Sequence, residues 1–272
     1  YIGQEFDCEQ LTEDIVESLE DDLCFAVEAE ELGACLYAAA ISALEADNIK
    51  EARFYLRLGL YSSVKATSLL AKLSHFKSED WTLPGTRRSQ LHVVLDLLVA
   101  EMLQERQIVE LLSSLLRSDD EMTADEKVFD QWAYEALKEY TLVLADCLLR
   151  NKEDIQGNIQ APYEQVFLYW NETEALRGAI QELNEYHISR ATYLRGRDFD
   201  ITEFSQYPFQ YFPVEIYALR SVRQSLGLDT PLPEHPLYIV KDIGKTVETA
   251  IEIRYKDSKD KIPWLFEIGG AL

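Results

Sequence analysis

The sequence predicts an all-α fold: a single domain of about seven to nine helices packed as antiparallel helical hairpins. Proline is scarce, with eight in 272 residues, none before Pro84 and none between Pro84 and Pro162. An interior proline costs a helix about 3 kcal/mol, so long proline-free stretches favour long helices. Apolar residues also recur at helical spacing along most of the chain. No long linker interrupts residues 1–272, and we therefore expect one domain, with an acidic helical hairpin region at 1–83 and the remaining helices and C-terminal segment at 84–272.

The N-terminal region predicts two helices joined by a tight turn, preceded by a short helix. Residues 12–19 carry a capping threonine and apolar side chains on one side. The apolar positions of residues 22–46 keep helical spacing, and the next helix covers 49–73. Asn48 can cap this helix, with Glu51 three residues further on. The helices 22–46 and 49–73 are therefore predicted to form an antiparallel hairpin.

The middle of the chain predicts four more helices. Thr86 can cap a long helix that runs to Leu116. The letters TADE at residues 123–126 form a capping-box pattern that opens a helix to about Arg150. Pro162 suits the first turn of a further helix. Asn171 and the residues after it cap a helix that ends near residue 194.

The C-terminal part contains one clear helix and one ambiguous segment. Residues 213–226 begin with a proline, keep an apolar stripe and end at Gly227, a residue typical of helix C-termini. Residues 237–256 mix β-branched residues with helical spacing, so helix and strand both stay open there.

The net charge is strongly negative and unevenly distributed. The chain has 49 acidic and 26 basic residues, a formal charge of −23. Residues 1–49 contain fourteen acidic residues and no lysine or arginine. The electrostatic field of this negative charge repels nucleic acid and anionic membranes and attracts cationic partners. The longest uncharged stretch, 32–44, is thirteen residues, shorter than the roughly twenty that span a bilayer.

The cysteines and histidines do not form a known metal or redox pattern. Four cysteines without CxxC spacing favour a reduced, cytoplasmic protein with buried thiols. The four histidines lack the Glu-x-x-His pairs of carboxylate metal centres. We therefore expect no metal and no cofactor.

Catalytic motifs are weak. Arg87 and His92 match the loose spacing of helical ribonucleases, but such a match arises easily by chance. Glu182, Glu185 and His187 are the nearest approach to an acid–base cluster, although Glu185 and His187 do not share a helix face. No residue is therefore predicted to be catalytic, and the protein is expected not to be an enzyme.

Two segments carry a family resemblance: the alanine-rich hairpin LGACLYAAAISALEADNIKEARFYLRLGLYSSVKA and the segment QYFPVEIYALRSVRQSLGLDTPLPEHPL. In pattern and order the chain resembles the all-helical immunity proteins of bacterial polymorphic toxin systems, most closely the immunity family numbered 49. The resemblance implies a cytoplasmic protein that binds a co-encoded toxin, often a nuclease or deaminase, and blocks it. It carries no catalytic motif and assigns no functional residue.

Charge and resemblance together predict a non-enzymatic immunity protein that neutralises a basic, nuclease-like toxin by occlusion, in bacterial competition. The predicted toxin-binding residues are acidic and form two patches: Glu13, Asp14, Glu17, Glu20, Asp21 and Asp22, and then Asp119, Asp120 and Glu121. A helical-repeat adaptor or chaperone that binds a protein partner is an alternative. A helical hydrolase that uses Glu182, Glu185 or His187 is another.

An aromatic segment precedes the last clear helix. Seven aromatic residues lie between Phe199 and Tyr217. We expect most of them to cover the end of the core, because aromatic side chains bury large apolar surfaces.

Overall fold

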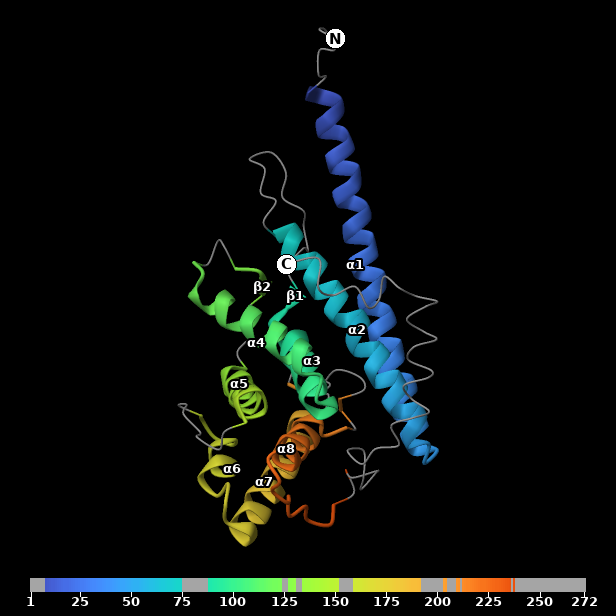
Figure 1. Ribbon diagram of the computed structural model, residues 1–272. Coiled ribbons are helices and arrows are strands. Elements are labelled where there is room, and N and C mark those ends of the chain that lie inside the picture. Colours follow the sequence, from blue (N-terminus) through green and yellow to red (C-terminus); the bar gives the residue numbers. More distant parts are fainter. Residues whose placement is uncertain are drawn as a thin grey trace, which may run out of the picture.

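The computed structural model is all-α and confirms the predicted fold class, with eight helices among the residues that it describes (Figure 1). These residues are 8–74, 88–123, 127–130, 134–151, 159–191, 203–204, 209–210, 212–235 and 237. For residues 8–22, 45, 72–74 and 130 only the backbone is described. The ambiguous segment 237–256 lies outside the described residues except for Leu237.

The long N-terminal hairpin pairs α1 (Cys8–Glu45) with α2 (Ile49–Ser74) along one side of the molecule (Figure 1). The prediction of a separate short helix at 12–19 is wrong, because α1 continues through it without a break. The cap of α2 is confirmed: the Glu51 backbone N–H donates to Asn48 Oδ1 (3.3 Å) and Asn48 Nδ2 donates to Glu51 Oε2 (2.6 Å).

Two glycines allow α1 and α2 to approach closely. A Cβ atom added at Gly59 would lie 2.7 Å from the ring of Tyr37 and 3.1 Å from the carbonyl oxygen of Gly33. Real Cβ atoms do not come so close to a ring, so the crossing requires glycine at 59.

A single long helix over 86–116 is not formed, because the chain breaks at Gln104. The segments are α3 (Gln90–Leu103) and α4 (Arg106–Glu121). Gln104 adopts a left-handed conformation (φ 58°), and the Glu105 N–H donates to the Ala100 carbonyl, as in a Schellman cap. The Gln104 side chain donates to the hydroxyl (3.1 Å) and carbonyl (3.2 Å) of Ser221 on the last helix. The break is therefore fixed by a tertiary contact.

The helix predicted from Thr123 begins later. Residues Arg88–Ser89 (β1) and Phe129–Asp130 (β2) form a two-residue parallel pairing, and α5 (Glu135–Arg150) follows. Asp119 at the end of α4 accepts the backbone N–H groups of Val128 and Phe129. This carboxylate holds the connection in a non-helical form.

The remaining helices are α6 (Glu164–Leu168), α7 (Thr173–Ala191) and α8 (Val214–Ser225). Gly227 has φ +79°, which confirms the predicted end of α8. α3 lies at the centre and packs against α2, α4, α5 and α8, so all of its residues except His92 are buried.

The aromatic segment covers the core as expected where it is described. Phe204, Phe209, Phe212 and Tyr217 are all buried. Among the cysteines with described side chains, Cys147 is buried but Cys24 and Cys35 are exposed, contrary to the expectation of buried thiols. No helix of the described part is long and apolar enough to cross a membrane.

Candidate functional site

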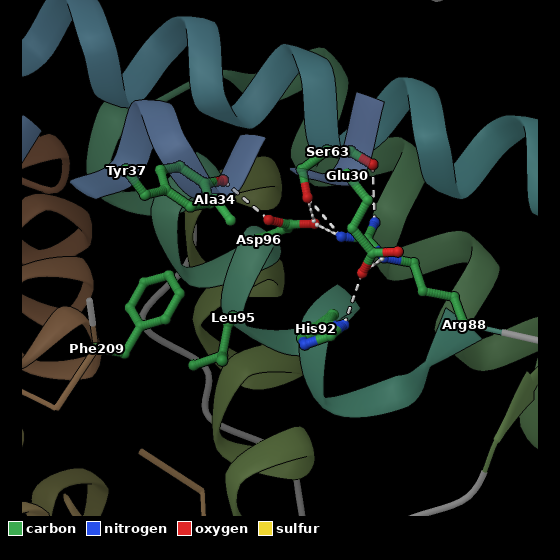
Figure 2. Close-up of a pocket in the computed structure, with 9 residues that line it drawn as sticks. All are labelled: Glu30, Ala34, Tyr37, Ser63, Arg88, His92, Leu95, Asp96 and Phe209. Carbon is green, nitrogen blue, oxygen red and sulfur yellow. Dashed lines mark hydrogen bonds and ion pairs between the residues drawn. The ribbon is translucent and has the colours of Figure 1, made fainter. Parts of the chain in front are cut away.

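A small pocket lies where α1 and α2 meet the start of α3 (Figure 2). Its volume is about 100 Å³, and its walls are Glu30, Ala34, Tyr37, Ser63, Arg88, His92, Leu95, Asp96 and Phe209. It is smaller than the roughly 300–1,000 Å³ pockets that enclose drug-sized ligands. The pocket therefore suits one side chain or a small group, not a large substrate.

The floor of the pocket is a buried ion pair. Asp96 Oδ2 lies 3.1 Å from Arg88 Nη2 and accepts a hydrogen bond from Ser63 Oγ (2.7 Å), while Oδ1 accepts one from the Tyr37 hydroxyl (2.8 Å). Arg88 also donates to the Ser63 carbonyl oxygen (2.8 Å) and to the Thr67 hydroxyl. Burial raises the pKa of Asp96, and Arg88 and the two hydroxyl donors oppose that rise. Both oxygens of the Asp96 carboxylate thus have partners within the floor.

The rim carries a second charged pair, Glu30 and His92. His92 Nδ1 lies 2.9 Å from Glu30 Oε1, which is also 3.4 Å from Arg88 Nε. The His92 hydrogen bond and the Arg88 charge outweigh burial and lower the pKa of Glu30 to about 2. Glu30 is therefore a carboxylate throughout the physiological pH range. About a third of each rim side chain is exposed.

Two polar atoms of the rim take no part in this network. Neither Glu30 Oε2 nor His92 Nε2 makes a hydrogen bond to the described residues. Figure 2 shows the second ring nitrogen of His92 on the side of the pocket where Leu95 and Phe209 lie. With Nδ1 donating to the carboxylate, neutral His92 presents Nε2 as an acceptor. The rim thus has two unused acceptors, and one of them, His92 Nε2, lies on the side of the apolar walls.

A second polar cluster lies deep in the core, around α3, α5, α7 and α8. His187 Nδ1 lies 2.8 Å from Glu215 Oε1, and Tyr140 donates to the Glu215 carbonyl oxygen (2.9 Å). Glu101 is fully buried, and neither of its carboxylate oxygens has a hydrogen-bond partner in the described structure. Burial raises the pKa of Glu101 well above its usual value. These groups have no contact with solvent, so we do not assign them to a binding site.

The first predicted acidic patch lies entirely on α1. Residues 13, 14, 17, 20, 21 and 22 fall on the N-terminal half of this helix, where only the backbone is described. Of the next three acidic side chains along α1, Glu28 and Glu31 are exposed and Glu30 is partly buried. The structure thus gathers the first patch on one continuous helix.

The second predicted patch is divided. Asp119 is 1% exposed and accepts two backbone N–H groups, so its prediction as a surface contact residue is wrong. Asp120 is exposed but pairs with Lys138 Nζ (2.8 Å). Glu121 is exposed. Burial of Asp119 follows from its role in closing the loop after α4.

The weakly predicted acid–base residues do not come together. His187 is buried against Glu215, whereas Glu182 and Glu185 are exposed on α7 and Glu185 lies 3.9 Å from His235. Of the pair Arg87 and His92, Arg87 lies outside the described residues and His92 is on the pocket rim. It is the neighbouring Arg88 that enters the pocket.

Sequence reasoning did not find the pocket, because its residues come from separate elements. Glu30 and Tyr37 lie on α1, Ser63 on α2 and Asp96 on α3. One signal was available: Asp96 is a lone charge inside the apolar run LHVVLDLLVA. A buried charge requires partners, so this pattern indicates a polar network without naming its members.

Within the described part of the chain, no group of three or more histidine, cysteine, aspartate or glutamate side chains is placed to hold a metal ion. Comparison of the chain with protein-family models, with curated proteins and with solved structures gives no match. The case for function therefore rests on charge, shape and the pocket.

Proposed function

We propose that this protein is a non-enzymatic immunity protein that binds a basic toxin and covers its functional surface. The observation that supports the proposal best is the distribution of charge on α1. The first 49 residues contain no lysine or arginine, and eleven of the fourteen acidic residues among them belong to this helix. Opposite fields speed the encounter of two proteins and favour the correct partner.

The shape of the hairpin supports the same proposal. α1 has 38 residues and α2 has 26, a difference of 12. At about 1.5 Å per residue, α1 is longer by roughly 18 Å. Figure 1 shows the N-terminal part of α1 reaching beyond the end of α2. Glu13, Asp14 and Glu17 lie on this projecting part, where an acidic helix can enter a nucleic-acid-binding cleft of a toxin.

Charge reversal tests the proposal. The triple variant Glu13→Lys, Glu17→Lys, Glu20→Lys should bind the toxin encoded by the adjacent gene at least about tenfold more weakly, since it adds like charges at the contact. Co-expression of this variant should no longer rescue growth, whereas the unmodified protein should rescue it.

The matched control is the triple Glu164→Lys, Glu172→Lys, Glu182→Lys. These three glutamates are exposed on α6, α7 and their connection, and the change in net charge is the same. The dissociation constant of the control variant for the toxin should stay within about threefold of that of the unmodified protein. Equal losses of affinity in both variants would mean that only net charge matters. Failure of the unmodified protein to rescue growth would overturn the proposal.

A further inference from the structure

The pocket at the α1–α2–α3 junction has no role in the proposed function so far. It lies on α1 about two to four turns beyond the first acidic patch, and α1 supplies Glu30, Ala34 and Tyr37 to its walls. A partner that lies along α1 therefore reaches its opening.

We propose that the pocket receives one arginine side chain of the basic partner, whose guanidinium donates to Glu30 and His92 while its methylene groups lie against Leu95 and Phe209. The identity of the partner rests on the proposed function. The two acceptors on the rim and the apolar walls beside them carry the inference.

Charge favours a cation in this position. Arg88 faces two carboxylates, Asp96 (3.1 Å) and Glu30 (3.4 Å), so one negative charge is not balanced within the pocket when His92 is neutral. The guanidinium of Arg88 is turned to the floor, where Asp96, Ser63 and Thr67 accept from it. Arg88 is itself 4% exposed. A second cation at the rim thus meets the Glu30 carboxylate first.

The geometry favours arginine over lysine or tyrosine. Glu30 and His92 present two separate acceptors, and a planar guanidinium has five donors in a fixed fork, whereas a tyrosine hydroxyl has one. Guanidinium groups also stack on aromatic rings, and Tyr37 and Phe209 stand edge to face with centroids 5.6 Å apart. A volume of about 100 Å³ accepts one such head group. Arginine is also among the residues that dominate interface energies.

The test uses the isolated protein and a small probe, N-acetyl-arginine amide, with binding followed by NMR shifts of the His92 ring. We expect a dissociation constant in the millimolar range. The neutral isostere N-acetyl-citrulline amide should bind at least about tenfold more weakly. Equal binding of the citrulline probe, or tighter binding of N-acetyl-tyrosine amide, would overturn the assignment.

Three variants locate the site. Glu30→Gln should weaken binding of the arginine probe about tenfold or more, and Ala34→Leu should abolish it by filling the pocket while Glu30 is kept. Glu31→Gln, at an exposed position of α1 outside the pocket, should bind like the unmodified protein. Thermal unfolding of each variant checks the fold, and Ala34→Leu carries the test if Glu30→Gln unfolds. Unchanged probe binding in Ala34→Leu would sink the proposal.

The outcomes separate this inference from the proposed function. Probe binding without rescue of toxin-exposed cells would leave the arginine pocket standing and reject the immunity role. Rescue that is unaffected by both Glu30→Gln and Ala34→Leu would support the immunity role and reject the pocket as a contact.

Discussion

Two carboxylates on α3, five residues apart, show how neighbouring groups decide the role of a buried acid. Asp96 accepts from Tyr37 and Ser63 and pairs with Arg88, whereas Glu101 has no partner for either oxygen in the described structure. Both side chains are almost completely buried. Asp96 therefore connects α3 to three other elements, α1, α2 and β1. Glu101 contributes a desolvation cost without compensation.

Glu101→Gln should stabilise the protein, and more so at higher pH. In the unfolded chain Glu101 ionises near pH 4.5, but burial raises its pKa well above that value in the folded state. The folded state then holds a proton that the unfolded state has lost, so stability falls as pH rises from about 4.5 through the folded pKa. Glutamine removes this loss. We expect the free energy of unfolding to rise by about 1–3 kcal/mol at pH 8 and by less at pH 5.

Thermal or urea unfolding at the two pH values measures the effect. Glu110→Gln serves as the control, because Glu110 is exposed on α4. Its free energy of unfolding should stay within about 0.5 kcal/mol of that of the unmodified protein. A Glu101→Gln variant that is destabilised equally at both pH values would show that the carboxyl group has a partner after all.

At the scale of elements, the α1–α2 hairpin depends on a close crossing at Gly33 and Gly59. Gly59→Ala should destabilise the protein by about 1–3 kcal/mol, because the new Cβ meets the buried ring of Tyr37 at 2.7 Å. The hydrogen bond from Tyr37 to Asp96 prevents that ring from moving away at low cost. Intrinsic helix propensity alone predicts the opposite sign, since alanine favours helix over glycine.

Gly178→Ala is the matched comparison within α7. No atom lies within 4 Å of a Cβ added there, so the substitution should stabilise by about 0.5–1 kcal/mol. Urea denaturation of the Gly59→Ala and Gly178→Ala variants measures the two changes in the free energy of unfolding. A stabilised Gly59→Ala variant would show that α1 and α2 cross less tightly than the structure has them.

The helices were predicted well where their ends carry local signals. Asn48 with Glu51 and Gly227 mark ends through contacts within a few residues, and both are confirmed. The break between α3 and α4 has no such signal. Gln104 is neither glycine nor proline, and its left-handed conformation accompanies its hydrogen bonds to Ser221, which is 117 residues away.

At the scale of the whole molecule, the acidic field should control the rate of association. The formal charge is −23, and opposite charges on a partner accelerate encounter through a field that salt screens. We expect the association rate with the basic toxin to fall by about tenfold or more between 50 and 500 mM NaCl, with a much smaller change in the dissociation rate. Stopped-flow mixing over a salt series measures both.

A salt-independent association rate would reject the acidic-surface mechanism. Weak binding of short peptides that salt does not affect would favour the helical-repeat adaptor instead. The three residues of the hydrolase alternative do not form one acid–base cluster, because His187 is buried while Glu182 and Glu185 are exposed.

Three properties follow from the amino-acid order alone: the helical class, the hairpin of α1 and α2, and the uneven charge. These properties depend on composition and on contacts within one helical turn, which the order of residues expresses directly. Tertiary structure alone decided that Asp119 closes a loop, that Glu101 has no described partner, and that Glu30, Arg88, His92 and Asp96 meet in one pocket. The physical reason is distance along the chain: each of these outcomes is set by burial and by partners that lie on other elements, and no local pattern records which elements will pack together.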